Sequence, residues 1–345
     1  MKDIIIVAAH PCIRVLKQAT VLKDLGYKLH LIFGEKIFGP LTAGSLERCQ
    51  LFESIQFYAN RYQFEASIKN ILHISNIFHI HNEPNWPVIK VRELVPDAKI
   101  IFDIHDSMYW RQDKEYREED VAVDCSDFMV VPSDACKDEL SGRTDKQVIV
   151  IPSAVPEKWY KLPSFSQGGL CSEGGHVLPD SEAYWRDFTD TYKMILKAGK
   201  EVYAYSAMFT QNEKLVQEFE ITKHYAGLGA KLANAEYDIL LEMMGTHDWN
   251  LVGNYRQKEH KVFKYALPNK FFDGLAAGIP PAVFNRPEVI KIVQENDIGI
   301  VCETPDELVD RWDEHREKRK NLMLERSRFS MENFISVLTD LYDSI

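Results

Sequence analysis

The sequence predicts an α/β protein built on parallel sheets. Apolar runs of strand length recur along the chain, for example at residues 3–9 and 147–152, and segments with helical spacing separate them. Such continuous apolar runs indicate strands that are buried on both faces of a parallel sheet. Because the chain has 345 residues, it is long enough for two domains, each with its own core.

The first unit of this pattern stands at the beginning of the chain. Residues 3–9 form the expected strand, residues 14–25 read as a helix that stops at Gly26, and residues 27–33 read as the next strand. This order is a βαβ unit. Arg14 lies in the first turn of the expected helix, where a solvated arginine is one interpretation and a ligand-facing arginine is the other.

The composition limits the class of protein. Hydrophobic residues make up 45% of the chain and charged residues 27%, as in a soluble globular protein. The net charge of −11 argues against broad electrostatic attachment to nucleic acid or anionic lipid, although a locally basic groove would not be visible in that sum. The six cysteines are scattered, without a pair at metal or redox spacing. We therefore expect free thiols in a cytoplasmic protein without a signal peptide or a transmembrane segment.

Polar residues follow two expected strands, at residues 77–81 and 99–105. The first strand ends in His81 and leads into a loop that contains Glu83, and the second ends in His105 and is followed by Asp106. Since ligands collect at the carboxyl ends of strands in open parallel sheets, this pattern indicates a site. Histidines that serve only as structural hydrogen-bonding groups are the other interpretation.

A zinc site is a further alternative for these histidines. Alternation along the strand points His79 and His81 to the same face. Neither the loop spacing nor any nearby cysteine favours zinc, however, so we expect no metal site.

The stretch 264–284, with the sequence KYALPNKFFDGLAAGIPPAVF, predicts a helix followed by a short buried strand. We expect Asn269 to cap a helix over residues 270–277, which ends at a glycine with two prolines beyond it. The start of a helix offers free amides and a positive dipole end to a phosphate, and Lys270 adds a positive charge. Asp273, one turn later, could accept hydrogen bonds from a ribose. An ordinary capped helix on a sheet is the other interpretation.

Two neighbouring segments favour a nucleotide site as well. A glycine-rich turn at 168–175, a helix over about 182–198 and a strand from 201 form the opening unit of a nucleotide-binding sheet, without the fingerprint that indicates NAD. Arg186 in the first turns of that helix opposes the helix dipole, which favours a ligand over a surface salt bridge. The stretch 254–270, which begins with Asn254, is the most basic part of an acidic chain and could contact a nucleotide or form a solvated loop.

Several of these segments resemble the GT-B glycosyltransferases of the family-4-like group. The stretch 264–284 contains LPNKFFDGLAAGIP, which resembles the lPnKlfeylaaGkPvv segment that binds the diphosphate and ribose of a sugar nucleotide in that group. The strand ends HIHNEPNW and DIHDSMYW resemble the pair that lies beside the reacting sugar. Tyr265 departs from the group, since many members carry a glutamate there and a second one where Asp273 stands.

The resemblance implies two Rossmann-like domains with parallel sheets that face a cleft. It implies an acceptor-side domain at residues 1–160, a domain for the nucleotide sugar at 161–326, and a C-terminal helix at 327–345 that crosses back to the first domain. The C-terminal stretch is amphipathic, so a tail that binds a partner is the alternative.

The resemblance also implies roles for individual residues. The residues expected to be catalytic are His105 and Asp106. Those expected to bind the donor are His176, Arg186, Asn254, Asn269, Lys270 and Asp273. Those expected on the acceptor side are Arg14, His81, Glu83 and Trp110.

The function that the resemblance implies is transfer of a sugar from a nucleoside-diphosphate sugar, with UDP favoured as the nucleotide, to a glycan or another hydroxyl acceptor. It implies a retaining reaction without a metal or a further cofactor. Three alternatives stay open: a non-catalytic binding module, a sugar-nucleotide epimerase, and a transferase that acts on modified DNA bases. The epimerase would need further acid and base carboxylates, and the net charge of −11 counts against DNA.

Overall fold

The computed structural model describes residues 2–9, 12–34, 50–82, 84–112, 116–164, 166–179, 181, 186–206, 212–256 and 261–345. Contacts within the chain divide it into two compact units. The first unit comprises the described residues up to Pro156 together with Met331–Ile345, and the second comprises Glu157–Ser330. The C-terminal segment is therefore part of the first unit.

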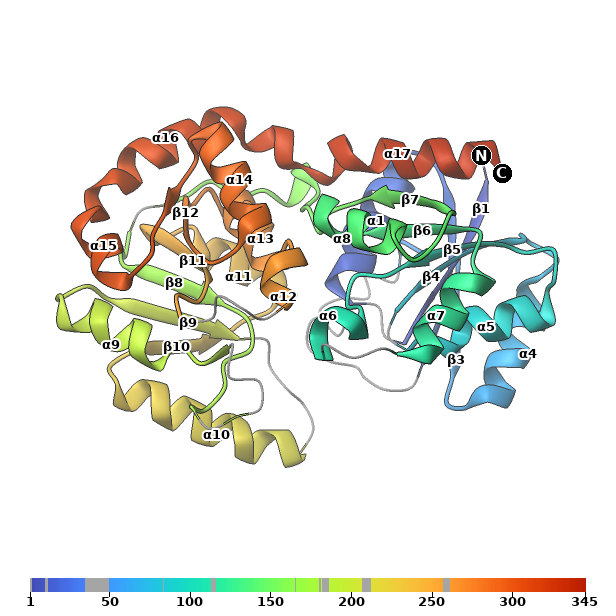
Figure 1. The fold of residues 1–345 in the computed structure, drawn as a ribbon, viewed down its shortest axis with the longest axis horizontal. Helices are drawn as coiled ribbons and strands as arrows, with labels where there is room; N and C mark the ends of the chain where they lie inside the picture. Colours follow the sequence, from blue (N-terminus) through green and yellow to red (C-terminus); the bar gives the residue numbers. More distant parts are fainter. Residues whose placement is uncertain are drawn as a thin grey trace. The chain divides into compact units, whose positions relative to one another are not determined.

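The first unit is built on a seven-stranded sheet in the order β3-β2-β1-β4-β5-β6-β7 (Figure 1). Its strands are β1 (Asp3–Ala8), β2 (Lys28–Gly34), β3 (Ser54–Tyr58), β4 (Ile77–His81), β5 (Lys99–Asp103), β6 (Phe128–Val131) and β7 (Gln147–Val150). All neighbouring pairs are parallel. The central strand β1 is buried over nearly its whole length, as its apolar run predicted.

Helices flank this sheet, and one of them comes from the end of the chain. They are α1 (Ile13–Asp24), α4 (Arg61–Ile71), α5 (Trp86–Leu94), α6 (Met108–Gln112), α7 (Arg117–Cys125), α8 (Asp134–Ser141) and α17 (Met331–Ser344). Helix α17 lies beside α1, so the two ends of the chain are close together (Figure 1). Lys2 Nζ donates a hydrogen bond of 2.7 Å to the carbonyl oxygen of Tyr342.

The second unit is built on a six-stranded sheet in the order β10-β9-β8-β11-β12-β13, and again every pair is parallel. Its strands are β8 (Leu170–Glu173), β9 (Val202–Ser206), β10 (Lys231–Asn234), β11 (Trp249–Gly253), β12 (Pro281–Phe284) and β13 (Ile300–Val301). Two parallel sheets in one α/β chain confirm the predicted fold class.

The second unit contains helices and short 3₁₀ turns. They are η1 (Glu157–Trp159), α9 (Thr189–Lys197), α10 (Asn212–Gly227), α11 (Tyr237–Met244), α12 (Lys261–Tyr265), α13 (Asn269–Ala277), α14 (Pro287–Asn296), α15 (Pro305–Asp310), η3 (Trp312–Glu314), α16 (His315–Glu325) and η4 (Arg326–Phe329). Across both units, none of the helices in the described part of the chain has the length and apolar content to span a membrane.

A local prediction for the second unit differs from the structure. The stretch 168–175 is not a single turn, because it contains the central strand β8, whose Leu170 and Cys171 are fully buried. The strand has only four residues and two glycines on each side, so the sequence pattern indicates a turn and not a strand. In the first unit, Glu119 of α7 lies among charged residues of the sequence but is fully buried, where it accepts a hydrogen bond of 2.7 Å from Ser107 and pairs with Arg143.

Candidate functional site

A buried carboxylate lies at the centre of a polar cluster in the first unit. Asp103, the last residue of β5, is fully buried, and Arg14 of α1 donates from Nε to both of its oxygens at 3.0 Å. Gln18 donates to Oδ2 from one turn further along α1, also at 3.0 Å. The Arg14 guanidinium also donates to Ser153 Oγ at 3.1 Å and to the carbonyl oxygen of Ile151 at 2.8 Å. Arg14 therefore joins β5 to the segment after β7.

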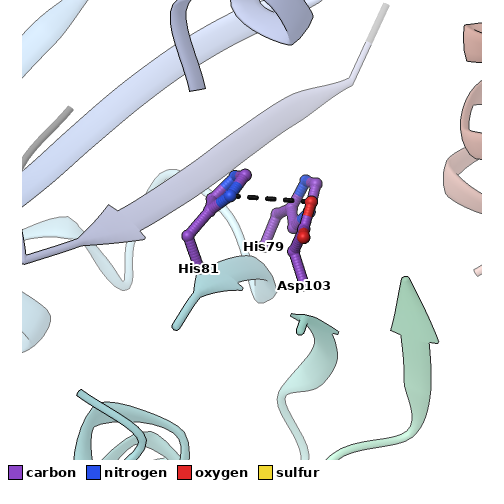
Figure 2. A group of neighbouring side chains, drawn as sticks. All are labelled: His79, His81 and Asp103. Carbon is purple, nitrogen blue, oxygen red and sulfur yellow. Dashed lines mark ion pairs between the residues drawn. The ribbon is translucent and has the colours of Figure 1, made fainter. Parts of the chain in front are cut away.

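Three histidines surround Asp103. His79 Nε2 and His81 Nδ1 lie 3.7 and 3.6 Å from Oδ2, and His105 Nδ1 lies 3.3 Å from Oδ1. Figure 2 shows His79 and His81 beside the carboxylate. Their rings stack with centroids 4.6 Å apart, which confirms that both point to one face of β4. His79 Nδ1 also hydrogen-bonds the hydroxyl of Tyr342 on α17 at 2.6 Å.

His81 and His105 do not carry the same charge. Burial lowers the pKa of His81 well below its usual value, so this ring is neutral at pH 7. Burial would also lower the pKa of His105, but hydrogen bonds to Asp103 and Cys12 raise it to about 10, so His105 is an imidazolium. Burial would raise the pKa of Asp103, but the Arg14 guanidinium holds it well below its usual value.

The donor atoms of His79, His81 and Asp103 lie within 4.8 Å of one another, a spacing that a metal site could have. The carboxylate, however, already accepts hydrogen bonds from Arg14 on both oxygens. A divalent ion there would stand beside a guanidinium and compete with it for the same lone pairs. This arrangement favours an internal ion pair, and the absence of a metal from the reaction stays a prediction.

Arg14 and His81 are both buried in the first unit. Both were expected on the acceptor side, but their exposed fractions are 1% and 2%. Arg14 is buried because Asp103, 89 residues away in sequence, needs a counter-charge, and its hydrogen bonds are used inside the protein. Contact of either side chain with an acceptor stays a prediction.

The catalytic candidates lie in the loop after β5, which ends at Asp103, two residues earlier than predicted. His105 is partly exposed and Asp106 is exposed, and the backbone amides of both donate to Asn82 Oδ1, at 3.1 and 3.3 Å. Asn82 thus joins the two strand ends. Trp110 is buried and donates from its indole nitrogen to a carboxylate of α8 at 3.0 Å. Glu83 lies outside the described residues.

In the second unit, Lys270 lies in the first turn of α13. The helix begins at Asn269, and its N-cap position is occupied by Pro268 in an extended conformation. Asn269 therefore does not cap the helix as predicted, because it is the first helical residue. Pro268 has no side-chain acceptor, which leaves the amides of the first turn without a side-chain cap.

Burial and two nearby arginines lower the pKa of Lys270. Burial is the largest cause that lowers the pKa of Lys270, to about 8, and repulsion from Arg286 and Arg186 adds to it, while Glu173 opposes the shift. Burial and Arg186 also lower the pKa of Arg286 to about 9. The Arg286 guanidinium lies over the ring of Phe263 at 3.9 Å. Three cations are thus held together against their mutual repulsion, and a bound anion would relieve it.

Two glycines after β8 bring the backbone close to these cations. Gly174 has φ +111°, and a Cβ atom there would lie 3.5 Å from Lys270 Nζ. A Cβ atom on Gly175 would lie 2.9 Å from Arg186 Nη1. This turn, Lys270 and Arg186 were predicted from the sequence, whereas Arg286 was not. The available signal was its position directly after β12, at the carboxyl end of a strand.

Three other residues expected to bind the donor are engaged inside the protein. The ring nitrogens of His176 hydrogen-bond the carbonyl of Gly174 at 2.9 Å and the hydroxyl of Tyr192 at 2.7 Å, and burial lowers its pKa to about 3. Asn254 is buried and donates to a backbone carbonyl at 2.6 Å. Asp273 is fully buried and accepts a hydrogen bond from Tyr237. A direct donor contact of these three side chains stays a prediction.

The basic stretch 254–270 is only partly described, because residues 257–260 lie outside the described residues. Arg256 is exposed and pairs with Asp190 of α9. Lys264 is exposed on α12, with its ammonium 5.1 Å from the centroid of the Tyr265 ring. Of the described basic residues in this stretch, Lys270 is the one grouped with Arg186 and Arg286.

Comparisons with known proteins place the fold. No family model and no curated protein matches the chain. A solved structure of TarM from S. aureus, a mutant in complex with fondaparinux, α-GlcNAc-glycerol and UDP, matches with a TM-score of 0.70 and 8% identity, over 99% of this chain and 100% of that one. A glycosyltransferase from Rickettsia africae matches with a TM-score of 0.66 and 13% identity, over 99% and 98% of the two chains.

A third match comes from another class of enzyme. A UDP-GlcNAc 2-epimerase from Methanocaldococcus jannaschii, in complex with UDP-GlcNAc and UDP, has a TM-score of 0.57 and 13% identity, over 98% of this chain and 99% of that one. The TM-scores and the coverage establish a shared fold, and at identities this low they establish the fold alone. The chain has the GT-B fold, which confirms the fold class that the resemblance implied, two parallel sheets flanked by helices.

We expect Arg14→Met to destabilise the protein by about 3–5 kcal/mol, because the substitution leaves the Asp103 carboxylate buried without its counter-charge. Urea denaturation followed by circular dichroism measures the effect. Lys23→Met, on the same helix, is the matched control, since Lys23 pairs with Glu53 at the surface and its loss should change the midpoint little. Equal effects of the two substitutions would contradict the role given to Arg14.

Proposed function

We propose that this protein is a glycosyltransferase that uses a nucleoside-diphosphate sugar, with UDP as the preferred nucleotide. The observation that carries the proposal is the group of Lys270, Arg186 and Arg286 around the first turn of α13, next to Gly174 and Gly175. A diphosphate binds to features of this kind: helix amides without a side-chain cap, three cations, and a glycine backbone that lets the ligand come close.

The same group would act on the reaction as well as on binding. When the bond between the sugar and the diphosphate breaks, negative charge builds on the departing diphosphate. Cations and helix amides aimed at that position stabilise the transition state more than the ground state. We propose that these groups suffice without a metal ion, and that Lys270 makes the largest contribution because it is charged and lies at the start of α13.

In the first unit, we propose that His105 and Asp106 act on the transferred sugar or on the acceptor. His105 is held by Asp103 as an imidazolium, so it can donate a hydrogen bond to a sugar oxygen but cannot accept a proton. Asp106 is exposed, whereas His105 is only partly exposed, so we propose that Asp106 contacts a hydroxyl group of the sugar or the acceptor. We further propose a retaining reaction with a glycan or another hydroxyl acceptor, and the roles of donor and acceptor domain for residues 161–326 and 1–160.

The neighbouring structures support the nucleotide in this proposal. The TarM structure holds UDP together with α-GlcNAc-glycerol, and the epimerase structure holds UDP-GlcNAc. Because of the epimerase match, epimerisation of a sugar nucleotide is the second candidate function. A diphosphate site would serve epimerisation and glycosyl transfer alike. The position of His105 as a fixed imidazolium favours transfer, since an epimerase needs groups that take up and release a proton.

Nucleotide binding should stabilise the protein, and Lys270→Ala should abolish the effect. At about a hundred times its dissociation constant, UDP should add about 2.7 kcal/mol, which thermal denaturation detects as a raised midpoint. GDP, ADP, CMP and NAD complete the panel. Lys264→Ala is the control, because this exposed lysine on α12 lies outside the group of cations and should leave the shift unchanged. If no nucleoside diphosphate stabilises the protein, the proposed donor site is wrong.

The affinity for UDP should fall as the pH rises through about 8. The diphosphate binds the protonated form of Lys270, whose pKa in the free protein is about 8, and the phosphate charge is already complete above pH 7. From that pKa, the dissociation constant should rise about fourfold between pH 7 and pH 8.5. Calorimetric titration measures it, and Lys270→Arg should flatten the dependence. A wild-type affinity that stays constant over this range would argue against contact with Lys270.

A further inference from the structure

A cavity of about 520 Å³ in the second unit is separate from the cations around α13. Its described lining comes from one face of α16 and from the residue before β11, and consists of Asp248, His315, Arg316, Arg319, Lys320 and Met323. The helical positions 315, 319 and 323 form one row, and positions 316 and 320 form the adjacent row, because residues four apart are neighbours on a helix surface. A single helix therefore supplies most of the cavity wall.

This cavity lies at the edge of the sheet opposite to Lys270. Asp248 directly precedes β11, so it stands at the amino end of that strand. Gly174 and Arg286, which belong to the group around Lys270, follow the carboxyl ends of β8 and β12. Strands β8, β11 and β12 are parallel neighbours. A ligand in the cavity is therefore a different one from the anion that the cations around α13 would hold.

The cavity wall carries more positive than negative charge. Arg316, Arg319 and Lys320 are cations, and Asp248 is the one carboxylate among the described lining residues. Arg316 and Lys320 are exposed, and neither forms an ion pair or a side-chain hydrogen bond with another residue in the described part of the chain. In a chain with a net charge of −11, two cations without acidic partners are available to an anionic ligand.

Arg319 is the buried cation of the cavity. Its exposed fraction is 7%, and Nη2 donates a hydrogen bond to the carbonyl oxygen of His247. Burial lowers the pKa of Arg319, and Asp248 opposes that shift. A guanidinium that is already held by the backbone loses little further conformational freedom when a ligand binds. An anion in the cavity would add a second negative partner for this buried charge.

Asp248 is held in a fixed position at the wall of the cavity. Its Oδ2 accepts hydrogen bonds from the backbone amide of Gly169 at 3.0 Å and from the indole nitrogen of Trp312 at 3.2 Å. Its Oδ1 lies 3.3 Å from His315 Nε2, and the side chain is 21% exposed. Since a carboxylate oxygen has two lone pairs, Oδ1 can accept a further hydrogen bond from a hydroxyl group in the cavity.

We propose that this cavity is a second ligand site, and that it binds a small phosphate ester rich in hydroxyl groups, such as a sugar phosphate. Arg316, Arg319 and Lys320 would hold the phosphate, and Asp248 would accept hydrogen bonds from the hydroxyl groups. The guanidinium fork matches the geometry of a phosphate, and a lysine adds a point charge. The volume falls within the range of about 300–1,000 Å³ that is usual for small-molecule sites.

The carboxylate selects between ligands. Inorganic phosphate would meet the repulsion of Asp248 without the hydrogen bonds that hydroxyl groups donate to it. A sugar phosphate, which can place its hydroxyl groups toward Asp248 and its phosphate toward the cations, is therefore the better ligand. This site is independent of the sugar transfer proposed above, so each can fail while the other holds.

Calorimetric titration of the full chain tests the site, with mannose 6-phosphate, glycerol 3-phosphate, inorganic phosphate and mannose as probes. Mannose 6-phosphate should bind more tightly than inorganic phosphate, and mannose, which lacks the phosphate, should not bind. Arg316→Gln or Lys320→Gln should raise the dissociation constant of mannose 6-phosphate about tenfold, because each removes a charged contact with the phosphate. Arg328→Gln is the matched control, since it removes an exposed charge outside the cavity, and it should leave the constant unchanged.

Asp248→Asn tests the contact with hydroxyl groups. The amide keeps the size of the side chain but removes its charge, so the affinities for mannose 6-phosphate and inorganic phosphate should approach each other. Circular dichroism verifies that this partly buried variant is folded. An unchanged preference for mannose 6-phosphate in the folded variant would contradict the role given to Asp248.

Three results would overturn the second site. The first is that none of the phosphate probes binds. The second is that Arg328→Gln weakens binding as much as Arg316→Gln does, which would indicate a general attraction of anions to basic side chains. The third is binding that Lys270→Ala abolishes and Arg316→Gln leaves unchanged, because that binding would belong to the donor site. We expect Lys270→Ala to retain mannose 6-phosphate, whether or not UDP binds at α13.

Discussion

The buried pair of Arg14 and Asp103 is the constraint on which the first unit depends. A carboxylate without contact to water must be neutralised and hydrogen-bonded, and Arg14 and Gln18 of α1 meet that need. Once the carboxylate is fixed at the end of β5, it orders the histidines of β4 and, through His79 and Tyr342, the helix from the end of the chain. The charge of His105 follows from the same carboxylate.

The second unit brings together charges of the same sign, whereas the first unit pairs opposite charges. In the first unit a buried negative charge is paired with a positive one, whereas around α13 Arg286 and Arg186 help to lower the pKa of Lys270, and Arg186 helps to lower that of Arg286. The rigid core beneath them, which includes the fully buried Phe271 and Leu275 of α13, holds them in place. Paired charges fix a framework, and neighbouring like charges indicate a place for a ligand of opposite sign.

The sequence allowed the fold to be predicted because most strands are continuous apolar runs, which can only be buried. Alternation in β4 also predicted that His79 and His81 share a face. Strand β8 was missed because it has four residues between pairs of glycines. Its absence from the prediction did not change the fold class, since the neighbouring strands had clear patterns.

The site was harder to predict, because its interactions join distant parts of the chain. The Lys270 segment could be identified from local signals, namely a helix start with a basic residue. Nothing near Arg14 in sequence indicates that Asp103 is its partner, and nothing near Arg286 indicates Lys270.

The most direct test of the account is release of nucleoside diphosphate from sugar nucleotides. Purified protein is incubated with UDP-, GDP- and ADP-sugars and a panel of hydroxyl acceptors, and the freed diphosphate is measured for the wild type and Lys270→Ala. The account predicts that one sugar nucleotide is cleaved with transfer to an acceptor, and that Lys270→Ala slows cleavage by at least about a hundredfold. A nucleotide that binds while its sugar is neither transferred nor released would contradict glycosyl transfer, and conversion of the bound sugar into its epimer would establish the other reaction.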